Sequence, residues 1–335
     1  MDRTKLHDKR SLVGRYIANN GILFGFLLIV LLLGIFARGF FTMTNLVTIL
    51  KQVSSIGIAT IGVGVLIIMN CNDLSIGSMF ALCGVTAGLA VSTGTGGLGL
   101  PPVFGFLAGI SSGVLFGLLN GVIVSKGRIP AFIVTLGTQA IARGLALILA
   151  HGMPVGSFPA AFNFPGTASV DPVGLIPWSV IIFLAVIILM DFVMKKLPIG
   201  RYTYAIGGNR EAALRAGVPV DRHIIMLYIL SAMTAGLAGV LHTARFSGGA
   251  ADSGDALMFT AIAAVVMGGV SLFGGAGRVA GTLVGALILA VLETGLVMIN
   301  VQTFYKYIVV GIIVVVAVLM DQARDLITGR AETVA

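Results

Sequence analysis

Long apolar runs separated by short polar connections dominate this chain. A helix needs about 20 apolar residues to cross a bilayer core, so the runs can be interpreted as membrane spans. They predict an all-α, polytopic membrane protein with about ten transmembrane helices. The predicted spans are 21–38, 45–69, 75–93, 103–125, 130–150, 176–194, 223–244, 258–273, 279–299 and 304–320.

The eighth predicted span is the least regular. Residues 258–273 form a short apolar run that ends in the glycine-rich sequence SLFGGAG. Glycine-rich interruptions are typical of broken or tilted helices in transport proteins. The sequence leaves open whether this segment crosses the membrane completely.

The distribution of basic residues predicts the orientation of the chain. With alternating spans, sixteen of the 21 lysines and arginines fall on the side of the N-terminus, and cytoplasmic loops carry the excess of basic residues. We therefore expect both termini inside, with a cytoplasmic segment 1–20, a membrane domain 21–320 and a cytoplasmic tail 321–335. No small-residue cleavage pattern follows the basic start, which favours a retained first span.

Composition excludes several other classes of protein. Of the 335 residues, 57% are hydrophobic and only 10% charged, with a mean hydropathy of +1.06, far from the balance of a soluble domain. The net charge of +8 comes from basic residues that flank apolar runs, so it does not indicate a nucleic-acid partner. The two cysteines and four histidines have no spacing typical of a metal site or a catalytic nucleophile.

Two connections are longer than the rest. The outer one, 151–177, is rich in Pro, Gly and Phe, which suits either an ordered cap or an inert connector. The inner one, 195–222, contains signals for a short helix: Asn209 as N-cap, Glu211 in the first turn, Arg215 near the end and Gly217 in the left-handed C′ position. Such a short helix is either docked on a partner or a capped turn between spans.

Four stretches of the sequence resemble one known family. GRYTYAIGGNREAALRAGV resembles the coupling loop of ABC importer permeases, in which a short Ala-rich helix fits a cleft on the ATPase subunit. The other three, 72–82, 120–149 and 260–296, resemble the sugar branch of that family, which includes ribose, xylose, arabinose and galactoside permeases. The similarity extends from about residue 40 to 320.

This resemblance implies a multi-pass permease of the bacterial inner membrane that imports a simple sugar. It also implies separate ATPase subunits, a periplasmic substrate-binding protein and a second permease copy, with a homodimer expected. No Walker A loop occurs in the sequence, so we expect no cofactor on this chain and ATP with Mg²⁺ on the partner ATPase. The residues expected to couple to the ATPase are Asn209, Glu211, Ala212, Ala213, Arg215 and Gly217.

The sequence departs from the family pattern at three places. Asn70, Cys71 and Asn72 stand where relatives usually have Gly-Gly-Ile, and Met258 and Thr260 stand where acidic residues are common. Glu293 and Thr294 replace a common pair of asparagines. These changes bear on the substrate, so a polyol, nucleoside or signalling sugar remains an alternative.

Polar and aromatic residues at membrane depth are the candidates for the translocation path, because burying them without a partner is costly. Asp73 is equally suited to capping the third helix, the phenylalanines to packing, and Glu293 to a helix contact. The candidates are Asn70, Asn72, Asp73, Phe132, Thr135, Thr138, Gln139, Arg143, Phe259 and Glu293.

Charged residues near the outer helix ends are candidates for docking the binding protein, although each also suits a solvated helix end. They are Arg38, Arg245, Asp252, Asp255 and Lys306. An ion-coupled secondary transporter is the main rival class, since Glu293 could carry a proton. An ion-coupled carrier would not need a docking helix at 209–217, and neither would a channel.

Overall fold

The computed structural model describes residues 25–302, 305, 307–313, 315, 316 and 319. Within these residues the protein is helical throughout and has no strand, only the isolated bridges Val155 with Gly249 and Ser169 with Pro177. The all-α prediction is therefore confirmed for this part of the chain. The helices are Gly25–Phe36, α2 (Met43–Ile68), α3 (Ile76–Val91), α4 (Pro102–Gly127), α5 (Ala131–Leu149), α6 (Ala160–Thr167), α7 (Trp178–Lys196), α8 (Pro198–Gly208), α9 (Arg210–Arg215), α10 (Val220–Phe246), α11 (Leu257–Met267) and α12 (Val279–Met298).

Six of these helices are long and apolar enough to cross a membrane. They are α2, α4, α5, α7, α10 and α12, and each coincides with a predicted span. The first span corresponds to the shorter helix Gly25–Phe36, and much of the tenth lies outside the described residues. The count of ten crossings and the orientation of the termini stay predictions.

The eighth predicted span is interrupted. Helix α11 contains 11 residues and ends at Met267, so it is about 16 Å long against a bilayer core of about 30 Å. Gly269, Gly274, Gly275 and Gly277 then adopt positive φ angles, which favour glycine and prevent a continuous helix. The segment is a half-length helix followed by a tight glycine loop.

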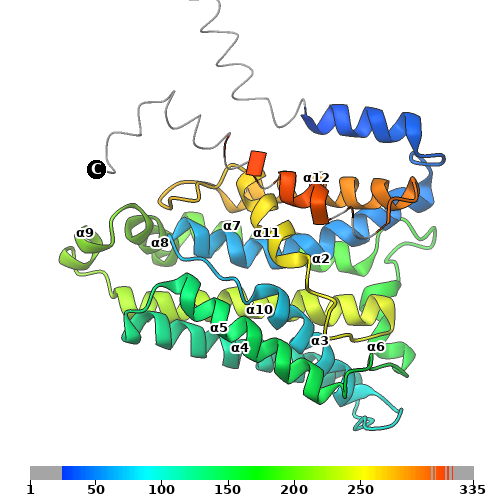
Figure 1. Ribbon diagram of the computed structural model, residues 1–335, viewed down its shortest axis with the longest axis horizontal. Coiled ribbons are helices and arrows are strands. Elements are labelled where there is room, and N and C mark those ends of the chain that lie inside the picture. Colours follow the sequence, from blue (N-terminus) through cyan, green and yellow to red (C-terminus); the bar gives the residue numbers. More distant parts are fainter. Residues whose placement is uncertain (1–24, 303–304, 306, 314, 317–318, 320–335) are drawn as a thin grey trace, which may run out of the picture.

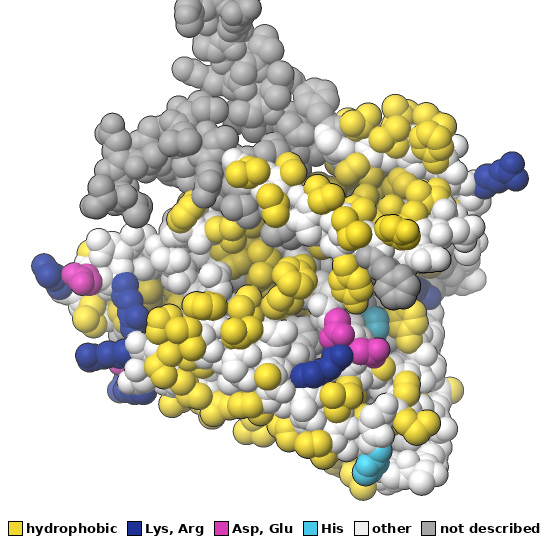
Figure 2. All heavy atoms as spheres, in the orientation of Figure 1, with side chains coloured by type: hydrophobic (Ala, Val, Ile, Leu, Met, Phe, Trp, Pro, Cys, Tyr) yellow, Lys and Arg dark blue, Asp and Glu magenta, His cyan; other side chains and the backbone are white. Residues whose placement is uncertain are grey.

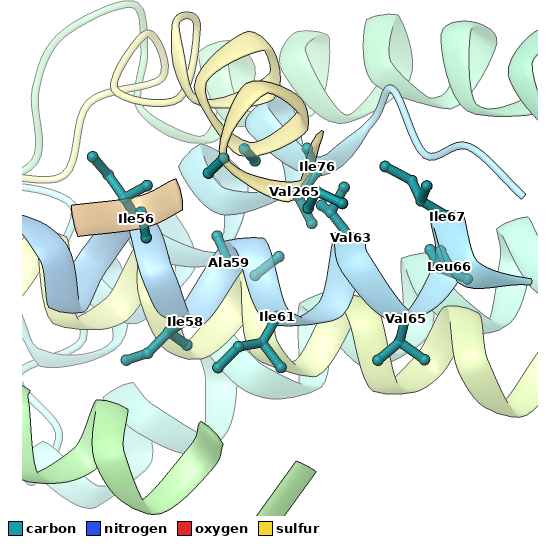
Figure 3. Packing of buried hydrophobic residues seen from close by; sticks show 14 of the residues in the cluster. Ile56, Ile58, Ala59, Ile61, Val63, Val65, Leu66, Ile67, Ile76 and Val265 are labelled. Carbon is teal, nitrogen blue, oxygen red and sulfur yellow. The ribbon is translucent and has the colours of Figure 1, made fainter. Parts of the chain in front are cut away.

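Helix α2 lies at the centre of the molecule. Among its 18 most apolar consecutive residues, 89% are buried, whereas the corresponding share is 28% in α5 and in α7. Ile58, Ile61 and Val65 point towards α10, and Val63 lies beside Ile76 and Val265 on another side (Figure 3). A helix that is hydrophobic on all sides and buried by protein on all sides is the core of the bundle.

Helix α4 packs through a row of glycines spaced four residues apart. A Cβ on Gly109 would lie 2.7 Å from the carbonyl oxygen of Cys83 on α3, and one on Gly113 would lie 2.7 Å from that of Ala232 on α10. A Cβ on Gly117 would lie 2.6 Å from the carbonyl oxygen of Tyr228. Small residues at this spacing let membrane helices approach backbone to backbone, which explains the close contact of α4 with both neighbours.

The connection 151–177, which the sequence predicts to lie outside, is structured. It contains α6, whose Phe162 is fully buried beside Phe106 of α4 and Phe158, and α6 also packs on α10. Asp171 accepts hydrogen bonds from the backbone N–H groups of Leu175 and Ile176. The segment is thus packed against the bundle, whereas its role as a cap over the membrane face stays a prediction.

Candidate functional site

The short helix α9 has the capping chemistry that the sequence predicts. Oδ1 of Asn209 accepts a hydrogen bond of 2.9 Å from the Ala212 N–H at the N-terminus. At the C-terminus Gly217 has φ of +83°, its N–H donates to Leu214 O at 3.0 Å, and the Val218 N–H donates to Ala213 O at 3.1 Å. This pair of bonds is a Schellman motif, so both ends of the helix are set by local sequence.

One side of α9 is buried and the other is free for a partner. Ala213 is 5% exposed, whereas Leu214 is 63% exposed. Glu211 and Arg215 lie one turn apart at 3.9 Å with strongly exposed side chains, a pair worth little to stability in water. Helix α9 lies at one end of the molecule (Figure 1), where Figure 2 also shows most of the basic side chains on that face.

Helix α8 supports α9, and the sequence analysis missed it. It packs against α7, α2 and α10. The Tyr204 hydroxyl donates to the Gly277 carbonyl oxygen at 2.8 Å, while Thr203 Oγ1 lies 2.9 Å from His223 Nε2. Burial, and secondarily the negative charge of Asp191, raises the pKa of Tyr204. This phenol therefore remains protonated and able to donate near neutral pH.

Two of the predicted path residues, Asp73 at the turn between α2 and α3 and Thr135 on α5, belong to a buried structural cluster. Oδ1 of Asp73 accepts from the N–H and the hydroxyl of Ser75 at 2.8 and 2.5 Å, and Asn120 Nδ2 donates to Ser75 Oγ at 2.9 Å. The Leu74 N–H donates to Thr135 Oγ1 at 3.1 Å. Asp73 thus organises the turn before α3, while α3 itself has Ser75 at its N-cap position without a side-chain cap.

The other path candidates near this cluster differ in exposure. Thr138 is buried and donates to the Thr135 carbonyl oxygen on its own helix. Asn70 and Asn72 are exposed; Asn70 has φ of +60°, and the Asn72 carbonyl oxygen accepts from the Tyr228 hydroxyl. Within this group, the asparagines are the exposed residues.

A second group joins α5 to the segment before α11. Arg143 forms a bidentate ion pair with Asp255 and donates to the Ala251 carbonyl oxygen. The two charged side chains are 29% and 44% exposed. Arg143 lies inside a predicted span, and a charge in direct contact with lipid tails is costly. This face therefore suits a water-filled path or a partner surface better than lipid.

Two further path candidates with exposed side chains lie on α5 and α11. Phe132 on α5 is 52% exposed and Phe259 on α11 is 48% exposed, while Gln139 is half-buried. Figure 2 shows a largely hydrophobic face with one small group of acidic and basic side chains in its middle.

A third group links four helices through hydrogen bonds. Gln52 on α2 donates from Nε2 to Glu293 Oε2 on α12 at 2.9 Å, and its Oε1 accepts from Arg245 on α10 at 3.1 Å. Thr260 on α11 donates to Glu293 Oε1 at 3.1 Å. The helix-contact alternative for Glu293 is thus realised, with both carboxylate oxygens engaged.

The predicted docking residues occupy different environments. Arg38 and Asp252 are exposed, and Asp255 is held by Arg143. Arg245 donates to Oε1 of Gln52, and its guanidinium lies over the Phe246 ring. Lys306 lies outside the described residues. Their role in docking stays a prediction.

Two polar residues of these groups were missed by sequence reasoning. Gln52 follows Lys51 near the start of its span, where polar residues are expected at a helix end. Asn120 lies one residue before a glycine of the α4 row. Polar type at membrane depth was the available signal in both cases. Among the described residues, no group of three or more His, Cys, Asp or Glu side chains is placed to hold a metal ion.

Comparison with known proteins identifies the family. Residues 45–318 match the model described as "Branched-chain amino acid transport system / permease component". The ribose import permease protein of Bacillus subtilis (strain 168) is 35% identical over 306 residues, covering 91% of this chain and 93% of the relative. The D-allose transport system permease protein of Escherichia coli (strain K12) is 36% identical over 309 residues, covering 90% and 91%.

A third relative extends this pattern. The L-arabinose ABC transporter permease protein of Azospirillum brasilense is 35% identical over 315 residues, covering 94% of this chain and 91% of the relative. No solved structure matches the chain. With several helices able to cross a membrane, the chain belongs to this permease family, among its sugar ABC transporter permeases, and is a multi-pass membrane protein.

Proposed function

We propose that this chain is the membrane-spanning subunit of a bacterial ABC importer for a simple, ribose-like sugar. The relatives named as permeases for ribose, allose and arabinose support this substrate class. A polyol, a nucleoside or a signalling sugar is the alternative substrate within the same family. A periplasmic binding protein would deliver the solute and set most of the specificity.

The observation that carries the proposal is the form of α9. It is a helix of 6 residues, too short to be stable alone, yet it is capped at both ends and presents an exposed face to solvent. A partner that docks there can bias the arrangement of the bundle through α8. We assign that partner as a separate ATPase that holds ATP and Mg²⁺, with no cofactor on this chain.

The proposed topology has ten crossings with both termini in the cytoplasm, and the functional unit contains two permease copies, most simply identical. The Arg143–Asp255 face is consistent with a path or a partner surface. Cysteines placed at Ala212 and Val173, which are both exposed, should react with membrane-impermeant reagents from opposite sides. Labelling of both from one side would contradict the proposed topology.

Substitution in α9 tests the coupling role. Glu211→Ala removes a first-turn charge that complements the helix dipole, and Gly217→Val places a β-branched side chain where φ is +83°. Both should lower transport and substrate-stimulated ATP hydrolysis while the permease still reaches the membrane. Wild-type transport and hydrolysis in both variants would overturn the assignment of α9.

A further inference from the structure

Three separate segments meet backbone to backbone at the end of α8, the helix that precedes α9. They are the C-terminal end of α8, the C-terminal end of α2 and the loop after α11. A Cβ on Gly207 of α8 would lie 1.9 Å from the Ile68 carbonyl oxygen of α2 and 2.7 Å from the Gly275 nitrogen. Real Cβ atoms do not approach so closely, so only glycine fits at Gly207 without a shift of the backbone.

Hydrogen bonds fix the same three segments. The Gly275 N–H donates to the Ile68 carbonyl oxygen at 2.8 Å, which satisfies one of the carbonyl groups left free at the end of α2. Two residues further along, the Gly277 carbonyl oxygen accepts from the Tyr204 hydroxyl of α8 at 2.8 Å. The loop is therefore bonded to α2 on one side and to α8 on the other.

The loop side of this contact also depends on glycine. Gly274 and Gly275 have φ of +81° and +69°, and a Cβ on Gly274 would lie 2.7 Å from Asn70 Cβ just after α2. Contacts without intervening side chains leave no flexible atoms to absorb a displacement. A movement of α8 is therefore passed directly to the end of α2 and to the break between α11 and α12.

We propose that Gly207, with Gly275, is a positioning residue that transmits movement of the α8–α9 unit to the central helix α2 and to the interrupted α11–α12 segment. The inference rests on the proposed function, because it assumes that an ATPase moves α9. The three segments connect α9 to the rest of the bundle. Helix α9 follows α8 directly, and α2 is the most buried long helix. Helix α11 contributes Thr260 to the group around Glu293.

The chain provides a matched control at the next position. A Cβ on Gly208 meets nothing within 4 Å, although Gly208 belongs to the same helix. Alanine favours a helix more than glycine does, so Gly207→Ala and Gly208→Ala have similar intrinsic effects on α8. A difference between the two variants therefore reports the contact with Ile68 and Gly275. Tyr204→Phe removes the bond to Gly277 without adding volume, and serves if Gly207→Ala does not fold.

The test uses the complete transporter in proteoliposomes, with its ATPase, its binding protein and the sugar that the binding protein retains. We expect the number of sugar molecules transported per ATP hydrolysed to fall about 2- to 30-fold in Gly207→Ala, the range for substitutions along a coupling route. Tyr204→Phe should lower this ratio by a smaller factor, and Gly208→Ala should keep the wild-type value. A merely structural role would lower the amount of active protein and leave the ratio unchanged.

Two outcomes separate this inference from the proposed function. If the wild-type complex transports sugar with ATP but Tyr204→Phe and any folded Gly207→Ala keep the wild-type ratio, the positioning role is wrong and the importer assignment stands. If the wild-type chain shows no ATP-dependent transport with any ATPase, the proposed function fails, and the inference fails with it.

Discussion

Gln52 and Glu293, far apart in the sequence, are joined by a hydrogen bond of 2.9 Å between Nε2 and Oε2. The amide oxygen of Gln52 accepts from Arg245 at 3.1 Å, so one neutral side chain links a cation on α10 to an anion on α12. The orientation of the amide matches both charges, because the N–H₂ group faces the carboxylate and the oxygen faces the guanidinium. Thr260 completes the group from α11.

Replacing Gln52 by leucine should destabilise the protein by about 1–3 kcal/mol, because two charged groups each lose a hydrogen-bond partner in a region of low dielectric. The measurement is the thermal unfolding midpoint in detergent. Ser54→Ala is the matched control on α2, since the Ser54 hydroxyl donates only within its own helix, to the Leu50 carbonyl oxygen. Equal midpoints for the two variants would show that the link is not significant for stability.

The Arg143–Asp255 pair should contribute little to stability but strongly to function. Both side chains are partly exposed, and pairs in such positions are worth about 0.2–1 kcal/mol. Arg143→Asp alone and Asp255→Arg alone should reduce transport, because each leaves two like charges at membrane depth. The double exchange restores an opposite pair and should recover part of the transport. No recovery in the double variant, with normal folding, would assign the effect to the individual side chains instead.

The glycine row on α4 predicts a sharp contrast with α5. A Cβ on Gly113 would lie 2.7 Å from the Ala232 carbonyl oxygen, whereas a Cβ on Gly137 meets nothing within 4 Å. Gly113→Ala should cost about 1–3 kcal/mol through overpacking, seen as a lower unfolding midpoint. Gly137→Ala should leave the midpoint equal or higher, because alanine is the better helix former. A stable Gly113→Ala variant would contradict the close packing of α4.

The turn held by Asp171 should loosen at low pH. Hydrogen bonds from the Leu175 and Ile176 N–H groups hold the pKa of Asp171 below its usual value. The ionised carboxylate therefore stabilises the turn above the pKa of the unfolded chain, near 3.9, and this stabilisation is lost as the pH falls through the lower, folded pKa. Hydrogen exchange at these two amides, corrected for the intrinsic pH dependence, should accelerate over that acidic range. Asp171→Asn should abolish the transition, and an unchanged profile in that variant would exclude Asp171 as its cause.

Sequence reasoning succeeded where the controlling physics is local. The six long apolar helices follow from apolar length, and α9 follows from the cap at Asn209 and the left-handed Gly217. The same approach missed α8, because its sequence PIGRYTYAIGG is rich in glycine, and glycine disfavours a helix unless packing requires it. Gly200 and Gly207 meet neighbouring backbone atoms, so tertiary contact explains their presence.

The polar groups at membrane depth were predicted only in part, because they too depend on contacts between helices. Residue type identified Asp73, Arg143 and Glu293 as exceptional, but their partners come from other helices. Glu293 and Gln52 are 241 positions apart, and Arg143 and Asp255 are 112 apart. A single sequence contains no signal that pairs such residues, and it likewise did not indicate that Arg245 donates to Gln52.

If a separate ATPase moves α9, uptake of sugar into proteoliposomes must depend on that ATPase. Radiolabelled ribose and the other simple sugars that the binding protein retains should accumulate only when the ATPase, the binding protein and ATP are all present. Ion gradients alone should drive no uptake. Accumulation at the full rate without the ATPase would show that α9 is not the docking site of a motor that powers transport.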